Sequence, residues 1–157
     1  MSWDKGREVI EELMTRGHLE QVAADPAEAT YLLERARTHL RTSAREAEDD
    51  PEIAYDALYA AARKALTAVL RQQGLRPTRG GGHEAVIHAA EAQLVPPLGQ
   101  VLRPYRRLRR QRGQGDYQAS EGAISPDDVR ADLLAATAIV DAAATVIPQL
   151  PVYVARR

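Results

Sequence analysis

The segment RRLRRQRGQGDY, Arg106 to Tyr117, holds the residues whose types and spacing best suit chemistry on a charged substrate. Five arginines fall within seven residues, in a chain whose formal net charge is −1. Arginine supplies fixed positive charge in a bidentate fork that matches phosphate, and a tyrosine hydroxyl can donate a proton. Three interpretations compete: a solvated helix face, a surface that binds phosphates, and the edge of a catalytic site.

Arg112 differs from the other arginines because it continues an apolar stripe. Residues at spacings of three and four predict one buried helix face, which consists of Leu98, Val101, Leu102, Tyr105 and Leu108. Four residues later the stripe reaches Arg112, which must find a partner or face a wet cleft, because an unpaired buried guanidinium is costly. A structural salt bridge to a neighbouring helix is the alternative to a catalytic role. Gly113 and Gly115 weaken the helix, so Tyr117 is expected to fold back beside Arg112 or to plug the end of the bundle.

The elements that must position these residues are helices. Three N-cap residues precede a proline at the first helical position: Asp25, Asp50 and Ser125. No window alternates with period two for long enough to suggest a sheet. The expected fold is an all-α up-and-down bundle with an extra N-terminal helix and close packing along an alanine seam. The predicted helices cover residues 3–16, 26–47, 51–73 ended by Gly74, 83–112 broken at Pro96-Pro97, and 126–147.

Length and composition limit the class of protein. With 157 residues we expect one bundle domain, residues 25–157, preceded by a helical extension, residues 1–24. The chain has no cysteine, which excludes thiolate chemistry and cysteine metal sites. The charged N-terminus and the lack of a membrane-spanning stretch predict a soluble, cytoplasmic protein without membrane contact. The low net charge argues against a generic nucleic-acid binder, so phosphate attraction must be local.

The order of an arginine-rich helix end, then arginine, four residues and an aromatic residue before a final helix, resembles the signature of HEPN domains. Arg112 and Tyr117 occupy the two motif positions as a variant R-x4-Y. The stretch from Ala54 to Val86 resembles the tyrosine- and alanine-rich helix and glycine-punctuated loop of actinobacterial-type members. The likeness runs from about Tyr31 to Leu150.

This resemblance implies metal-independent endoribonuclease activity in a toxin-antitoxin or antiviral defence system, without a cofactor. It also implies a homodimer with a composite site at the interface and a nucleotidyltransferase-type antitoxin as a partner. Arg112 and Tyr117 would be the catalytic residues, and the neighbouring arginines would bind RNA phosphates: Arg106, Arg109 and Arg110. Tyr117 stands where the strongest ribonuclease motif has histidine, and Gly113 where asparagine is common. A non-catalytic RNA-binding or protein-interaction module is therefore the alternative.

Other residues carry weaker signals. Glu84, His88 and Glu91 recur on one helix face with metal-ligand types, but no second cluster completes a shell, so a solvated face with local pairs is expected. TRGGGHEAV, residues 78–86, lacks the lysine and hydroxyl of a P-loop, and we interpret it as a flexible connector. Tyr55 and Tyr59 are predicted to be interior or interface residues whose hydroxyls reach water or a partner.

Overall fold

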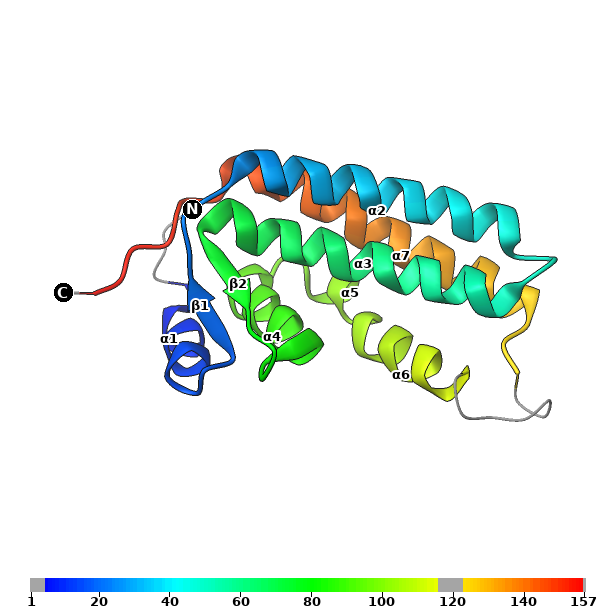
Figure 1. Ribbon diagram of the computed structural model, residues 1–157, viewed down its shortest axis with the longest axis horizontal. Coiled ribbons are helices and arrows are strands. Elements are labelled where there is room, and N and C mark those ends of the chain that lie inside the picture. The colour runs from blue at the N-terminus through cyan, green and yellow to red at the C-terminus, as the bar shows by residue number, and fades with distance from the viewer. Residues whose placement is uncertain (1–4, 116–122, 157) are drawn as a thin grey trace.

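Three long helices form the main layer of the molecule in the computed structural model, which describes residues 5–115 and 123–156 (Figure 1). They are α2 (Pro26–Glu46), α3 (Pro51–Gln73) and α7 (Pro126–Val146). Helix α3 packs against both α2 and α7, and shorter helices cover its other side. The predicted all-α bundle is confirmed.

The three predicted helix starts are also confirmed. The Asp25 carboxylate accepts a hydrogen bond from the backbone N–H of Glu28, and Asp50 accepts one from Ile53. Ser125 makes a capping box in which its hydroxyl and backbone N–H both bond to Asp128. These contacts satisfy N–H groups that no helical carbonyl can reach.

The predicted fourth helical stretch consists of three pieces: α4 (Gly82–Leu94), α5 (Gly99–Leu102) and α6 (Tyr105–Gly115). The break at Pro96-Pro97 is confirmed, because proline lacks the N–H that would continue the helix. The predicted end at Arg112 is corrected, since α6 continues through Gly113 to Gly115. One glycine costs a helix only about 1 kcal/mol, which is too little to end it.

The N-terminal segment adds α1 (Arg7–Thr15) and a short strand, β1 (Leu19–Gln21). Strand β1 pairs antiparallel with β2 (Leu75–Pro77), and a 3-10 turn, η1 (Ile147–Gln149), follows α7. The expectation of no sheet is wrong, because strands of three residues are too short to show a period of two. The boundary between residues 1–24 and 25–157 stays a prediction.

Small residues let the neighbours of α3 approach closely. The alanine seam predicted from the sequence is buried, and it consists of Ala54, Ala57, Ala61, Ala65 and Ala68. Gly74 ends the helix with φ 80°, a left-handed conformation that glycine adopts without a Cβ clash. A Cβ at Gly74 would also lie 2.8 Å from the carbonyl oxygen of Val22.

One segment, Pro126–Gln149, is long and apolar enough to cross a membrane. No such segment was expected from the sequence. The segment corresponds to α7 and η1, and α7 packs against α3 and α2 in the bundle. Packing against two helices explains its apolar character.

A buried polar contact joins α3, α6 and α7. The Tyr55 hydroxyl donates to Asp132 Oδ2 at 2.7 Å, and Arg107 pairs with Asp132 Oδ1 at 2.7 Å. Burial, followed by the hydrogen bond to Asp132, raises the pKa of Tyr55 far above its ordinary value. The tyrosine therefore acts as a neutral donor that fixes the position of α6 against the long helices.

We expect Asp132→Ala to lower the free energy of unfolding by about 2 to 3 kcal/mol, because it leaves the Tyr55 hydroxyl buried without its acceptor. Urea denaturation measures the loss. Asp141→Ala on the same helix is the control, since Asp141 and its partner Arg37 are both exposed and such pairs contribute less than about 1 kcal/mol. Equal losses in the two variants would contradict a structural role for the buried contact.

Candidate functional site around Arg112

Arg112 lies near the end of α6, where it faces α3. Its Nε atom is 3.4 Å from Asp56 Oδ1, and its guanidinium carbon is 5.7 Å from the centre of the Tyr59 ring. The side chains of Arg112 and Asp56 are each 40% exposed. The predicted salt bridge to a neighbouring helix is thus present, but the guanidinium also remains accessible to solvent and to a ligand.

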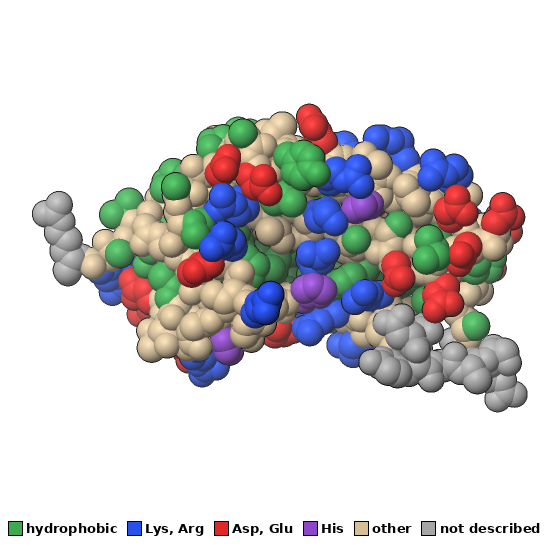
Figure 2. All heavy atoms as spheres, viewed as in Figure 1, with side chains coloured by type: hydrophobic (Ala, Val, Ile, Leu, Met, Phe, Trp, Pro, Cys, Tyr) green, Lys and Arg blue, Asp and Glu red, His purple; other side chains and the backbone are tan. Residues whose placement is uncertain are grey.

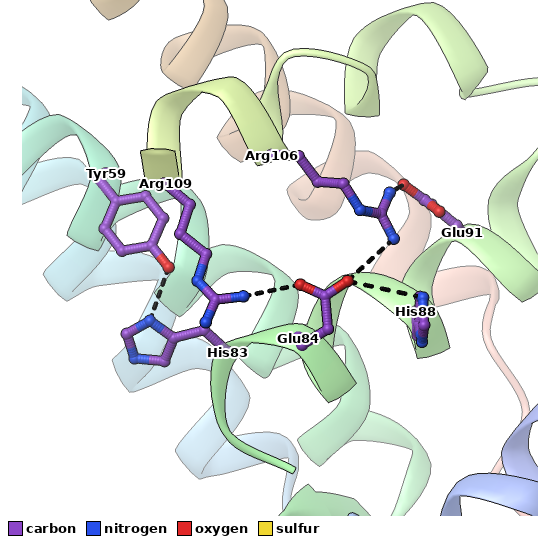
Figure 3. Close-up of polar contacts among 7 residues, drawn as sticks. All are labelled: Tyr59, His83, Glu84, His88, Glu91, Arg106 and Arg109. Atoms are coloured by element: carbon purple, nitrogen blue, oxygen red, sulfur yellow. Dashed lines mark hydrogen bonds and ion pairs between the residues drawn. The ribbon is translucent and has the colours of Figure 1, made fainter. Parts of the chain in front are cut away.

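His83, which the sequence analysis did not select, contacts the same tyrosine. The Tyr59 hydroxyl and His83 Nδ1 are 2.7 Å apart, and the two rings are 5.6 Å apart at an angle of 47° (Figure 3). Either group can donate in this contact, depending on the tautomer of the imidazole. In the tautomer that donates from Nδ1, His83 Nε2 retains a free lone pair and can act as a base.

A tightly packed turn positions His83 at the start of α4. The Thr78 N–H donates to the carbonyl of His18 at 3.1 Å, and the Gly81 N–H donates to the Thr78 hydroxyl at 3.2 Å. A Cβ at Gly81 would lie 2.0 Å from the His18 carbonyl oxygen, so only glycine fits there. The interpretation of this segment as a flexible connector is corrected: it joins β2 to α4, but at Gly81 it packs closely against His18, just before His83.

Burial and three arginines set the electrostatics at His83. Burial lowers the pKa of His83, and the charges of Arg63, Arg109 and Arg112 lower it further. The imidazole is consequently neutral at pH 7, the state in which it can accept a proton.

Tyr105 packs against Tyr59 beneath the site. Its ring is fully buried and lies 5.7 Å from the Tyr59 ring. Its hydroxyl is buried and has no hydrogen-bond partner among the described residues. Burial raises the pKa of Tyr105 far above the ordinary value, so this hydroxyl stays protonated.

The three arginines predicted to bind RNA line one open pocket of about 330 Å³ together with Glu84. Arg109 pairs with Glu84 at 2.7 Å, and Arg106 pairs with both Glu84, at 3.3 Å, and Glu91 (Figure 3). Arg110 is exposed and makes no ion pair with another described residue. The structure therefore brings all three together, but two of them already have acidic partners. Their role in RNA binding stays a prediction.

The face of Glu84, His88 and Glu91 forms local pairs. Glu84 also lies 3.6 Å from His88 Nε2, in addition to its two arginines. Across the described ranges, no group of three or more histidine, aspartate or glutamate side chains is placed to hold a metal ion. The carboxylates on this face connect α4 to α6.

Tyr117, the second predicted catalytic residue, lies outside the described residues. Its position beside Arg112 stays a prediction. Among the described residues, Arg112 contacts Asp56 and Tyr59, and its charge also acts on His83.

The class of this molecule is a helical bundle in which a fixed cation near the end of α6 and a neutral imidazole at the start of α4 contact the same tyrosine of α3. A family model described as HEPN domain matches residues 29–146, which is well over half of the chain. The protein belongs to the HEPN family, as the sequence resemblance predicted. Comparisons with curated proteins and with solved structures found no match.

A weak sequence signal for the missed residues existed. Tyr59 and Arg63 are four apart and therefore share a face of α3, and His83 opens α4 directly after the glycines. Only the packing of α4 and α6 beside α3 shows that Arg112 and His83 both contact Tyr59. Such proximity between distant segments is not encoded in local spacing.

Proposed function

We propose that this HEPN protein acts on RNA as a metal-independent endoribonuclease. The observation that carries the proposal is that Arg112 and His83 both contact Tyr59, so that a fixed cation and a neutral base lie around one side chain. RNA cleavage through the 2′-hydroxyl needs a base, a proton donor and positive charge for the developing phosphorane. The described residues supply the first and the third.

The proposed reaction starts with proton transfer from a ribose 2′-hydroxyl to His83 Nε2. The 2′-oxygen then forms a bond to the adjacent phosphorus while the bond from phosphorus to the 5′-oxygen breaks. Arg112 neutralises charge on the non-bridging oxygens, and the leaving 5′-oxygen takes a proton from an acid, for which Tyr117 is our candidate. The products are a 2′,3′-cyclic phosphate and a free 5′-hydroxyl.

The proposal includes a homodimer, in which a second copy brings a second Arg112 and Tyr117 to the same RNA. Arg106, Arg109 and Arg110 would bind phosphates beside the reacting one. A cytoplasmic protein of a toxin-antitoxin or antiviral defence system, paired with a nucleotidyltransferase-type antitoxin, agrees with the family and with this chemistry. The described site needs no cofactor for the reaction as written.

The second candidate is a non-catalytic RNA-binding or protein-interaction module. It is favoured by the ion pairs of Arg106 and Arg109 with Glu84 and Glu91, because these pairs give the arginines a structural role. It is also favoured by tyrosine in place of the motif histidine at residue 117.

Incubation of the purified protein with mixed RNAs in EDTA separates the two candidates. The endoribonuclease should produce fragments in EDTA, and Arg112→Ala should produce few or none. RNA that is bound by both proteins but remains intact would favour the module. An intact RNA pool without binding would contradict the endoribonuclease and the RNA-binding form of the module, and would leave the protein-interaction form.

A further inference from the structure

A second group of cations lies on α2 and α3, whereas the predicted RNA-binding arginines lie on α6. We call Arg35, His39, Arg63 and Lys64 the cationic strip. All four side chains are half-buried, so each presents part of its surface to solvent. Figure 2 shows Lys, Arg and His side chains gathered in a band across the middle of this face, over α2, α3 and the shorter helices, with most acidic side chains nearer its ends.

The cations of the strip lie near one another, and none of them has an acidic partner in an ion pair among the described residues. Burial lowers the pKa of Lys64, and the charges of Arg63 and Arg35 lower it further. Burial likewise lowers the pKa of His39, together with the charges of Lys64, Arg35 and Arg63. No ion pair joins Arg35, Arg63 or Lys64 to an acid within the described ranges. Repulsion between like charges is therefore left uncompensated by this part of the chain, and a bound polyanion would relieve it.

The strip is electrostatically continuous with the site around Arg112. Arg63 acts on His39 and Lys64 on one side and on His83 on the other, where Arg109 and Arg112 also act. A chain of phosphates that followed these cations would arrive at His83. The Nε2 atom of His39 adds a buried polar atom that has no hydrogen-bond partner among the described residues.

An exposed aromatic side chain beside the strip indicates which kind of polyanion the strip binds. Tyr31 is 54% exposed and lies one turn before Arg35, which itself lies one turn before His39. A flat aromatic ring next to a line of cations can stack a nucleobase while the cations hold the backbone. An acidic peptide would use the cations but would have no flat base to place on Tyr31.

We propose that the cationic strip and Tyr31 bind single-stranded RNA and direct its backbone to the Arg112 site. This inference rests on the proposed function, because the strip would serve the same RNA that the site cleaves. It assigns substrate binding to α2 and α3 in addition to α6. The strip would carry the strand on the 5′ or the 3′ side of the reacting phosphate.

The test uses a fluorescently labelled 2′-O-methyl oligouridylate, which cannot be cleaved through its own 2′-hydroxyl. We compare the unaltered protein with a triple variant, Arg35→Gln, Arg63→Gln and Lys64→Gln. Each phosphate contact on a single strand releases roughly 0.7 counterions. Loss of three contacts should therefore reduce the slope of log K against log salt concentration by about 2. Tyr31→Ala should weaken binding by about tenfold while leaving the salt dependence unchanged.

A matched control removes three other charges from α2: Arg37→Gln, Arg41→Gln and Arg45→Gln. These arginines are exposed and lie on a different face of the helix, so we expect a small change in affinity. The melting temperature of the strip variant should stay equal or rise, because the substitutions remove repulsion. Lys64→Gln alone provides a milder variant whose affinity should fall if the triple variant does not fold.

Three outcomes would contradict RNA binding by the strip. The triple variant could bind the oligouridylate as tightly as the unaltered protein, or the strip and control variants could lose equal affinity. The third is tight binding of polyglutamate with no binding of the oligouridylate. If the strip variants bind normally but Arg112→Ala abolishes cleavage, the inference fails and the proposed function stands. If the strip binds RNA but no RNA is cleaved, the inference stands and the endoribonuclease fails.

Discussion

Replacement of Arg112 by alanine should slow RNA cleavage by about a hundredfold or more while the protein remains folded. The reason is that Arg112 supplies charge where negative charge develops in the transition state, an interaction that typically contributes a factor of this size. Arg112→Lys should recover part of the rate, because an ammonium keeps the charge but not the bidentate fork. Single-turnover cleavage of a labelled RNA in EDTA measures these rates.

The control for this prediction is Arg110→Ala on the same helix. Arg110 is exposed and makes no ion pair with another described residue, so its loss should affect binding more than the rate of a bound complex. The salt bridge of Arg112 to Asp56 is exposed, so its loss should change stability by less than about 1 kcal/mol. Equal rates for Arg112→Ala and the unaltered protein would remove Arg112 from the catalytic site.

His83→Gln should also reduce the cleavage rate by about a hundredfold, and it should change the pH profile. A general base of this kind contributes about 10²- to 10⁴-fold. Burial and the charges of Arg63, Arg109 and Arg112 hold the pKa of His83 below 6.5, so the neutral, active form dominates at pH 7. As the pH falls through that lowered pKa, His83 gains a proton and kcat/KM should decrease. The acid limb should therefore lie below pH 6.5 and disappear in the variant.

His88→Gln is the matched control for this experiment. His88 lies on the same helix, is exposed and contacts Glu84 instead of Tyr59. Its variant should keep both the rate and the acid limb. An acid limb that persists in His83→Gln would assign the titrating group elsewhere in the protein and contradict the role of His83.

The sequence predicted the long helices because local signals specify them. The prolines and caps at Asp25, Asp50 and Ser125 determine where three helices begin, and Gly74 determines where one ends. Such signals depend on residues within one turn of the helix end. The fold class and the family followed from these signals together with the order of the motifs.

The composition of the site was only partly predictable. Arg112 was identified because it stands in register with an apolar stripe, which is visible in local spacing. His83 was missed because its contact with Tyr59 depends on how α4 packs beside α3. It also depends on the glycine turn before α4, which is held by the hydrogen bond from the Thr78 N–H to the His18 carbonyl. The pairing of Arg106 and Arg109 with Glu84 likewise depends on the approach of α4 to α6.

The most direct test of the proposed activity compares two labelled strands under single-turnover conditions in EDTA. One strand is RNA, and the other is the same RNA with a 2′-deoxy nucleotide at the cleavage position. Each is incubated with the unaltered protein and with Tyr117→His. The unaltered protein should cut only the ribonucleotide strand and leave a 2′,3′-cyclic phosphate, and Tyr117→His should cut it faster because histidine titrates near neutral pH. If both proteins are folded and neither cuts any RNA, the endoribonuclease is contradicted and the interaction module remains.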